Sequence, residues 1–578
     1  MLNLLKRVLP IATWLPGYSR SALGGDLMAG LTMGVMLIPQ GMAYAMLAGV
    51  PPIYGLYASL VPLVVYPFFG SSRHLAVGTV AIDMVIVAVG LGALAEPGSA
   101  RYIELAIVLA LMVGGIQMLM GVARLGFVVN LLSRPVIVGF TAAAALIIAF
   151  SQLGNLLGVA LPRSEQVFAV VGEAIRRIGE IQPWSLALGA GGMVLLLGLR
   201  RWRRLMPGPL VAVVLGTLVV WGLGIDRQGV AVVGAIPMGL PAPSMPDFDA
   251  ATLRALLPTA MALVLVQFLT VVSLGKIFAA RHHYWIKPNH ELFAIGAANF
   301  FGSFFRGIPV SGSLSRTAVS EEAGAQTPLA NIVAAGLIAL TLLFLTPLFH
   351  YLPIPILAAI IMMAAFGLLD LQQLRYLLRA KRIDGALAIL TFLATFFVGI
   401  LQGILIGIVA SVVAIMYRIS RPNIAILGHL PGTRSFRDVH RRPEAQCIAG
   451  ILLLRVDASF SFANAEYLKD FILQHTQDDG SPVRAVIVDA STMNDLDMTA
   501  VGVLTFVAEA LRRRDIALYM TGVKGAARDV ARRSELVETL GEDHFFLSPH
   551  RAVKHILKGW GRLDEYLENV PDGETVVE

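Results

Sequence analysis

The stretch Gly307-Ile-Pro-Val-Ser-Gly-Ser-Leu-Ser-Arg316 interrupts a very hydrophobic region in the second half of the chain. Pro309 and Gly312 break any helix there, and the helix-compatible run that follows, 314–325, has only about 12 residues. At about 1.5 Å per residue it covers roughly 18 Å, little more than half of a ~30 Å hydrocarbon core. We therefore predict a half-helix whose free N–H groups and positive dipole end point into the membrane beside Arg316. This arrangement predicts an anion site.

A Ser/Gly-rich loop outside the membrane, followed by an ordinary helix, would give the same letters. A second stretch favours the half-helix. Gly70-Ser-Ser-Arg-His-Leu-Ala-Val-Gly-Thr-Val-Ala81 is again rich in Ser and Thr and punctuated by glycine, and the apolar run 80–94 is short for a full span. Paired interrupted segments in the two halves of a membrane protein are typical of inverted repeats with a substrate site at their crossing.

The composition is that of an integral membrane protein. Of the 578 residues 56% are hydrophobic and 14% are charged, whereas soluble domains carry about 25% charged residues. A single cysteine, Cys447, excludes an internal disulfide framework and a multi-cysteine metal site, and we expect neither metal nor cofactor. Residues 1–23 contain charges and prolines, so we expect no cleavable signal peptide. The basic pI of about 9.5 reflects membrane loops, and we expect no nucleic-acid partner.

The chain is expected to divide near residue 420. The first 420 residues carry 26 of the 45 basic and 15 of the 38 acidic side chains, and after them apolar runs give way to ordinary globular alternation. We expect an interfacial, cytoplasmic N-terminal segment over 1–25, a membrane transport domain over 26–420, a cytoplasmic globular domain over 436–562 and a tail over 563–578.

Two polar residues lie in the first apolar span, 27–47. Gln40 follows Pro39 in its middle, and Tyr44 lies one turn later, so Gln40 and Tyr44 share a helix face. A lone Gln in a span more often makes a helix-packing hydrogen bond. Beside a proline and facing two short helices, it becomes a candidate pocket residue.

Several motifs in the right order carry a family resemblance. In the first half they are Pro39-Gln40-x-Met42-Ala43-Tyr44, Pro52-x-Tyr54-x-Leu56-Tyr57, Pro62, Tyr66, Gly70-x-Ser72-Arg73-His74 and Gly78, and in the second half Pro309-x-Ser311-Gly312-Ser313-x-Ser315-Arg316. Over about residues 10–560 the sequence resembles the sulfate permease (SulP) family of anion transporters, which includes prestin-like relatives. The resemblance implies an α-helical membrane protein of fourteen segments in two inverted repeats of seven, arranged as core and gate domains, followed by a cytoplasmic α/β STAS domain.

The apolar runs of the sequence agree in outline with the fourteen segments that the resemblance implies, because counting the runs alone gives twelve to fourteen. Basic clusters follow the even-numbered spans and place both termini inside by the positive-inside rule. These clusters are at 200–204, at Lys276 and Arg281, at 375–382 and at Arg418 and Arg421. We expect a multi-pass protein of the cell (inner) membrane.

The resemblance places the anion between the facing N-termini of the third and tenth segments. One side is Thr79, Val80 and Ala81, the other is Ser313, Leu314, Ser315 and Arg316, and Gln40 and Tyr44 come from the first segment. Backbone N–H groups and a hydroxyl replace part of the hydration shell of a small anion, and Arg316 compensates its charge. An unpaired Arg at mid-bilayer costs about 2.5–3.5 kcal/mol, so a role for Arg316 is expected.

One departure from the family concerns coupling. Many proton-coupled relatives have a glutamate in the eighth segment, and the matching position, which belongs to the expected substrate site, is Thr270. Thr270 cannot carry a proton, so the resemblance does not extend to proton symport, and exchange with a counter-anion, uniport or sodium coupling stay open. Asp83, one turn past Val80, is a candidate coupling residue that replaces the lost glutamate, or else it caps or snorkels.

The C-terminal domain alternates strands and helices and resembles STAS domains and their anti-sigma-factor-antagonist relatives. In those relatives a loop Asp-Ser-Ser-Gly can be phosphorylated, and the matching letters are Asp497-Met498-Thr499-Ala500. Thr499 is a regulatory candidate, although the missing Ser and Gly favour a purely structural helix cap. We expect this domain to regulate or assemble a homodimer.

The leading functional hypothesis is a secondary transporter of small inorganic or organic anions (sulfate, bicarbonate, chloride or dicarboxylates). The alternative is a channel-like or motor-like relative that binds an anion but transports little, which the absence of a carboxylate at Thr270 keeps open. A polytopic membrane enzyme needs clustered His, Asp or Glu at membrane depth. Apart from Asp83 the spans offer almost none, and we predict no catalytic residues.

Overall fold

The computed structural model describes residues 9–127, 133–161, 166–202, 207–477 and 483–568. The chain forms two compact units, Met1–Ser411 and Val412–Glu578, each described by itself.

The membrane part is a succession of helices that agrees with the expected count of fourteen. Seven described helical stretches are long and apolar enough to cross a membrane, and four shorter apolar ones accompany them. In chain order the segments are α3 (Arg20–Leu47), α4 with α5 (Ile53–Tyr57, Val61–Phe69), α6 (Ala81–Gly92), α7 (Ala100–Val122), α8 (Arg134–Ser151), α11 (Pro183–Trp202), α12 (Gly208–Leu223), α13 (Ala250–Arg281), α14 (Pro288–Ser303), α15 (Leu314–Glu322), α16 (Leu329–Leu340), α17 (Ile354–Phe366), α19 (Arg382–Phe397) and α20 (Ile400–Ser420).

Short helices connect or flank these segments. They are α2 (Ile11–Trp14), α9 (Leu153–Leu157), α10 (Val167–Arg176) and α18 (Leu371–Ala380). In α10 and α18 the apolar residues lie on one face, which suits a position between spans better than a span.

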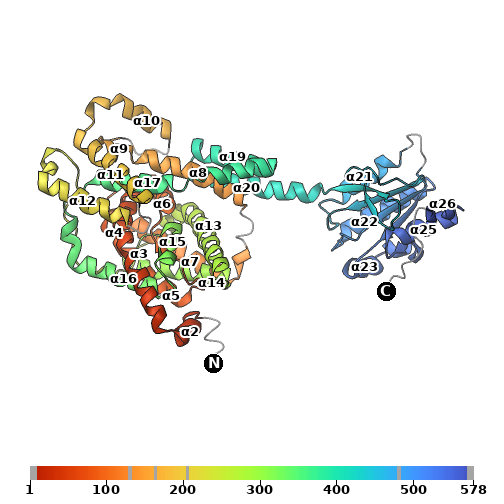
Figure 1. Ribbon diagram of the computed structural model, residues 1–578, viewed down its shortest axis with the longest axis horizontal. Helices are drawn as coiled ribbons and strands as arrows, with labels where there is room; N and C mark the ends of the chain where they lie inside the picture. Colours follow the sequence, from red (N-terminus) through yellow and green to blue (C-terminus); the bar gives the residue numbers. More distant parts are fainter. Residues whose placement is uncertain (1–8, 128–132, 162–165, 203–206, 478–482, 569–578) are drawn as a thin grey trace. The chain divides into compact units, whose positions relative to one another are not determined.

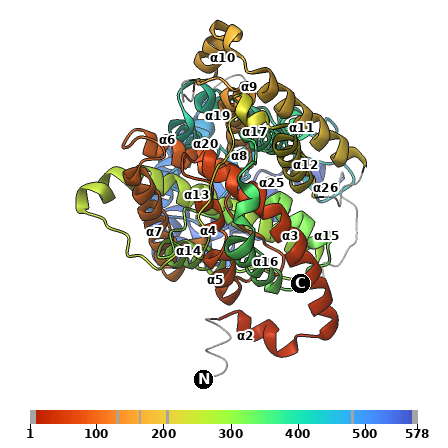
Figure 2. The ribbon, with the colours of Figure 1, turned by 90° about the vertical axis from the view of Figure 1, so that its left-hand side faces the viewer.

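The segments pack as two groups, and each group draws on both halves of the chain (Figure 1). In the first group α7 packs on α13 and α14, α5 on α14 and α16, and α3 on α15 and α16. Figure 2 shows α3 and α16 side by side. In the second group α8 packs on α17 and α19, and α11 packs on α12 and α17. These groups have the composition expected of a core and a gate domain.

The first group packs with backbones in close approach. A Cβ atom on Gly114 of α7 would lie only 2.4 Å from the backbone nitrogen of Phe300 on α14. Glycine is therefore required at this crossing. Small residues at helix interfaces are the usual route to tight packing in membranes, where lipid is as apolar as the side chains.

Two half-helices interrupt the first group at equivalent places, as the sequence predicts. The third segment, α6, has 12 residues, and the tenth, α15, has 9 residues. Each follows a two-residue strand, β1 (Val77–Gly78) and β2 (Ser311–Gly312), and the strands pair antiparallel with Val77 opposite Gly312 and Gly78 opposite Ser311.

The second unit is an α/β sandwich, as expected. Its sheet has the order β4-β3-β5-β6-β7-β8, in which β5 to β8 run parallel and β3 pairs antiparallel with β4 and β5. The strands are β3 (Ile424–His429), β4 (Phe436–Asp438), β5 (Ile451–Val456), β6 (Ala485–Asp489), β7 (Ala517–Thr521) and β8 (Phe545–Phe546). Helices α21 (Ala465–His475), α22 (Met498–Arg512), α23 (Gly525–Arg533) and α24 (Leu536–Leu540) share one core with the sheet. Another core contains α25 (Pro549–Gly559) and α26 (Leu563–Leu567).

The sheet begins upstream of residue 436, the expected start of the domain, with β3 at Ile424–His429. Strand β3 pairs with the central strand β5, so that Ile424 lies opposite Val456 and Ile426 opposite Leu454. The residues that directly follow α20 therefore belong to the sheet.

Candidate anion site

The two half-helices present N-terminal ends that no side chain caps. Val80 is the N-cap residue of α6 and Ser313 that of α15, and neither makes a side-chain capping hydrogen bond. The Ser313 hydroxyl lies 3.3 Å from that of Ser315 instead. The first N–H groups of both helices are thus without a side-chain partner, and the positive ends of two helix dipoles lie beside one strand pair.

Arg316 is fully buried and reaches across from α15 to both other elements of the predicted site. Its Nη2 donates to the Thr79 carbonyl oxygen at 2.9 Å, and its Nη1 donates to Gln40 Oε1 at 3.3 Å. Tyr44, also buried, lies within electrostatic range of the guanidinium group. The structure therefore brings Gln40, Tyr44, Thr79 and Arg316 together, and their role in anion binding stays a prediction.

Gly78 leaves the space that Arg316 occupies. Its φ of +152° lies in a region that favours glycine. An added Cβ would lie 3.2 Å from Arg316 Nη2 and 3.1 Å from Leu37 Cδ1. A side chain at position 78 would crowd the guanidinium group.

Further hydrogen bonds fix the strand pair. The Ser313 N–H donates to the Ala76 carbonyl at 3.0 Å, and the Ala76 N–H donates to Thr317 Oγ1 at 3.0 Å. Asn331 of α16 donates through Nδ2 to the Leu75 carbonyl at 2.9 Å and accepts at Oδ1 from the Val77 N–H at 3.3 Å. Sequence reasoning did not identify Thr317 or Asn331.

Glu291, on α14, anchors the loop that leads into β1 and was also not predicted. Its buried carboxylate accepts at Oε1 from the Ser71 N–H (2.7 Å), the Ser71 hydroxyl (2.6 Å) and the Ser72 N–H (2.9 Å). Its Oε2 accepts from the Tyr66 hydroxyl at 2.6 Å. The only signal available in the sequence was an acidic residue inside an apolar run.

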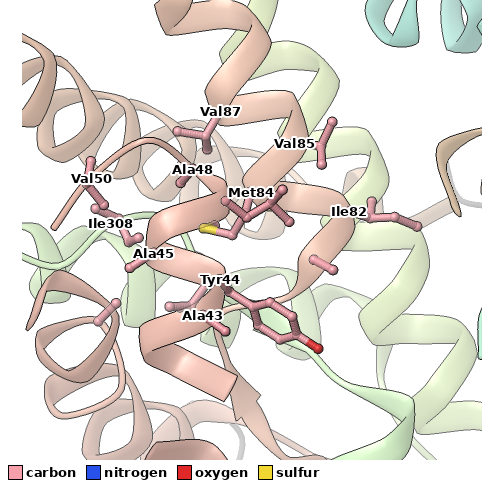
Figure 3. Close-up of a cluster of buried hydrophobic side chains, with 14 of the residues drawn as sticks. Ala43, Tyr44, Ala45, Ala48, Val50, Ile82, Met84, Val85, Val87 and Ile308 are labelled. Carbon is pink, nitrogen blue, oxygen red and sulfur yellow. The ribbon is translucent and has the colours of Figure 1, made fainter. Parts of the chain in front are cut away.

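The predicted residues at the helix tips differ in exposure. Thr79, Ala81 and Ser313 are buried, Val80 is half-buried, and Leu314 and Ser315 are exposed. The N-terminal tip of α15 is therefore accessible, whereas Arg316, the next residue along the helix, is buried. Figure 3 shows part of the apolar cluster to which Met84, Val85 and Val87 of α6 and Ala43, Tyr44 and Ala45 of α3 belong.

Unpaired polar atoms gather at this crossing. Twelve side-chain nitrogen or oxygen atoms among the described residues are buried without a hydrogen-bond partner. Five of them belong to the strand pair, to the helices around it or to the link between β1 and α6: Thr79 Oγ1, Asp83 Oδ2, Gln267 Nε2, Ser311 Oγ and Arg316 Nε. Because a buried polar group without a partner costs about 1–3 kcal/mol, such a concentration indicates a place for a polar ligand.

Thr270 and Asp83 occupy different environments. Thr270, half-buried on α13, donates its hydroxyl to the Val266 carbonyl of the same helix at 2.8 Å. Asp83 is buried in the first turn of α6, and its carboxyl group lies within the electrostatic range of Arg316. An acid there also suits the positive end of the helix dipole.

Thr499 lies exposed in the first turn of α22, in the second unit. The cap of this helix is Asp497, whose Oδ1 accepts from the Ala500 N–H at 2.8 Å. Thr499 therefore does not cap the helix. Its regulatory role stays a prediction.

The fold defines a class of protein: a polytopic membrane protein whose two halves each contribute a half-helix to one crossing, beside a buried arginine. The sulfate permease family matches residues 23–391, and the STAS domain matches residues 442–552. The chain belongs to the sulfate permease family and carries a C-terminal STAS domain.

Curated relatives match over nearly the whole chain. A probable sulfate transporter of Mycobacterium tuberculosis is 37% identical over 549 residues, which cover 94% of this chain and 98% of the relative. The chloroplastic sulfate transporter 4.1 of Arabidopsis thaliana is 36% identical, over 92% of this chain and 80% of the relative. Anion transport is the activity that this membership supports.

Solved structures share the fold. The murine solute carrier 26 family member A9, an anion transporter solved in the inward-facing state, has a TM-score of 0.88 at 25% identity and covers 96% of this chain and 95% of its own. The transmembrane domain of the cyanobacterial bicarbonate transporter BicA has a TM-score of 0.60 at 22% identity over 68% of this chain and 98% of its own. The latter likeness concerns the fold alone.

Proposed function

We propose that the protein is a secondary transporter that carries a small anion by alternating access and holds it between the N-termini of α6 and α15. Backbone N–H groups of both half-helices and the hydroxyl groups of Ser313 and Ser315 face the anion, and Arg316 balances its charge. The core group carries this site past the gate group, and exposes it to one side of the membrane at a time.

The observation that carries the proposal is the set of unpaired buried polar atoms at the crossing. Thr79 Oγ1, Ser311 Oγ and Arg316 Nε all lack partners within residues that surround two uncapped helix ends. A bound anion accepts hydrogen bonds from such donors, and the helix dipoles favour its charge. The two relatives, one named a sulfate transporter and the other a probable sulfate transporter, support the same class of substrate.

The test is uptake into proteoliposomes that contain the purified full-length protein. Labelled sulfate, bicarbonate, chloride and dicarboxylates are offered in turn, with and without imposed pH and sodium gradients. We expect saturable uptake of at least one of these anions. Uptake that needs an anion inside the vesicle indicates exchange, whereas binding without saturable uptake identifies the channel-like or motor-like alternative.

We further propose that both termini lie in the cytoplasm. The proposal depends on the basic residues after even-numbered spans, since positive loops stay on the cytoplasmic side. Of the cluster at 200–204, residues 203 and 204 lie outside the part of the chain that the structure describes.

A homodimer assembled largely through the STAS domain is the state we propose for the membrane-embedded protein. Removal of the chain after Ser420 is expected to weaken dimerisation and lower expression or rate, because it removes the whole sheet from β3 onward and leaves α20 intact. Sulfate affinity should stay nearly unchanged, since each protomer keeps its own site between α6 and α15. Light scattering in detergent and sulfate binding measure the two effects.

The matched control for this truncation removes only residues 569–578 and should change neither dimerisation nor affinity. A truncated protein that melts cooperatively yet no longer binds sulfate contradicts the proposal, because part of the site would then lie in the C-terminal unit.

A further inference from the structure

A chain of buried amides leads from the strand pair to Gln267 on α13, a helix that packs on α6. The Val310 N–H, just before β2, donates to Asn299 Oδ1 at 2.7 Å, and Asn299 Nδ2 donates to Gln267 Oε1 at 3.2 Å. Gln117 Nε2 donates to the same Gln267 oxygen at 3.1 Å. Asn299, Gln267 and Gln117 come from α14, α13 and α7, and all three are buried.

These bonds decide which way the Gln267 amide points. A backbone N–H can only donate, so Asn299 presents its oxygen to Val310. Its nitrogen lies among three acceptors: the carbonyl oxygens of Val310 (3.0 Å) and Ile295 (3.1 Å) and Gln267 Oε1 (3.2 Å). Gln267 therefore turns its oxygen toward the amide nitrogens of Asn299 and Gln117, and its Nε2 has to point elsewhere. That nitrogen and Asp83 Oδ2 are both buried without a hydrogen-bond partner, and the helices that carry them, α13 and α6, pack against each other.

We propose that Gln267 is a positioning residue: held by Asn299 and Gln117, it directs an N–H donor at Asp83 and thereby sets the pH at which Asp83 exchanges a proton during anion transport. This inference rests on the proposed anion site. The Asp83 carboxylate takes the proton from water and returns it to water, so no other reactant is involved.

The charges at the site explain why the proton matters to the anion. With Asp83 ionised, its charge opposes that of Arg316 and disfavours a second negative charge nearby. With Asp83 protonated, the charge of Arg316 is free to act on the anion. Anion binding and proton binding then strengthen each other by the same factor, and anion affinity rises as the pH falls.

Other ionisable groups around α6 do not offer the same function. The charge of Arg316 interacts electrostatically with the Asp83 carboxyl group, and the Tyr44 hydroxyl group of α3 interacts in the same way with Arg316. The Tyr102 hydroxyl of α7 donates to the Ala48 carbonyl and lies 3.5 Å from that of Ala88, farther along α6. The remaining ionisable side chains of the helices packed on α6 lie in the first two or last two turns of α3, α7, α8 and α13, and α17 has none.

A proton fits the surroundings of Asp83 better than a metal cation does. Sodium, as a hard cation, needs several free oxygen ligands. Here the oxygen of the Gln267 amide faces the amide nitrogens of Gln117 and Asn299, which leaves its N–H side for Asp83. An amide donor stabilises a carboxylate directly.

The test is sulfate binding by the full-length protein in nanodiscs from about pH 5 to about pH 8, since sulfate keeps one charge state over this range. For the parent protein we expect affinity to rise at lower pH by up to about tenfold per pH unit. Gln267→Met, which has a similar volume and no donor, should move the midpoint of the profile upward by about one pH unit. Gln117→Leu, which leaves Asn299 as the holder of Gln267, should move it less.

Asp83→Asn identifies the titrating group. It should flatten the pH profile, and in this background Gln267→Met should have no further effect on the pH dependence. Gln152→Leu is the control, because Gln152 is also a buried amide but bonds to Ser151 and Asn155 at the end of α8. It should leave the midpoint in place.

Three outcomes overturn the inference: an unchanged midpoint in both Gln267→Met and Gln117→Leu, a pH profile that survives in Asp83→Asn, or affinity that follows sodium and not pH. A parent protein that binds none of sulfate, bicarbonate or chloride instead removes the proposed function, so the two failures are distinguishable.

Discussion

Replacement of Arg316 by alanine is expected to lower anion affinity by at least about hundredfold while the protein stays folded. The guanidinium group supplies the full positive charge at the crossing of α6 and α15, and it also bridges Thr79 and Gln40. Without it, the anion meets only the partial charges of two helix ends. Sulfate titration by calorimetry and a thermal melt of the same sample measure the two effects.

Two companion variants sharpen this result. Arg316→Lys keeps a charge but has no planar fork to bond two oxygens at once, so we expect an intermediate loss of affinity. Arg254→Ala removes an exposed arginine at the beginning of α13 and should bind like the parent. Undiminished affinity in Arg316→Ala would remove this residue from the site.

The Glu291→Ala variant is expected to lower the free energy of unfolding by about 3 kcal/mol or more. The substitution leaves the N–H groups of Ser71 and Ser72 and the Tyr66 hydroxyl without their acceptor. Because this loop leads into β1, the loss should also loosen the strand pair beside Arg316. Unfolding by heat in detergent, followed by circular dichroism, measures the change.

Glu291→Gln is the informative partner of this variant. The amide oxygen of the glutamine still accepts from Ser71 and Ser72. Its NH₂ group takes the place of the oxygen that accepts from the Tyr66 hydroxyl, so only that bond is lost. We therefore expect a smaller decrease in the free energy of unfolding than for Glu291→Ala. Glu322→Ala, at the exposed end of α15, is the control and should unfold like the parent. Equal stability of Glu291→Ala and Glu322→Ala would contradict the role of Glu291 as an anchor.

Local signals predicted the half-helices well. Glycine, proline and serine at the breaks are visible in the sequence, and the expected starts at Val80 and Leu314 fall within one residue of α6 and α15. The expected ends at about 94 and 325 are two to three residues too long. The end of α15 does carry a local signal, because Gly324, with a φ of +98°, directly follows the C-cap residue Ala323.

Part of the site depends on contacts between distant segments, which no local pattern records. Gln117, Gln267 and Asn299 each read as a lone polar residue in an apolar span, and only the packing of α7, α13 and α14 shows that they bond to one another. For the same reason Glu291 was not assigned a role. The family resemblance placed Thr270 at the site. In the structure its hydroxyl group donates to the Val266 carbonyl of its own helix, a bond that the resemblance does not reveal.

The start of the C-terminal domain was also hard to place from the sequence. The sequence Ile424-Ala-Ile-Leu-Gly-His429 directly follows Arg421-Pro422, which mark the end of the last span. Residues 421–435 lie outside both expected domains, although the pairing of Ile424–His429 with β5 makes them part of the sheet.

The pairing of β1 with β2 limits how the length of the chain can vary in related sequences. One inserted or deleted residue in either strand would shift the register and turn each following side chain to the opposite face. It would also remove Gly78 from its place opposite Ser311 and separate Arg316 from the Thr79 carbonyl. Arg316 and Thr79 are 237 positions apart in the sequence. Even so, the segment around β1 cannot change length unless the segment around β2 changes with it. We therefore expect aligned relatives to show gaps in the loops on either side and none within 75–81 or 310–316.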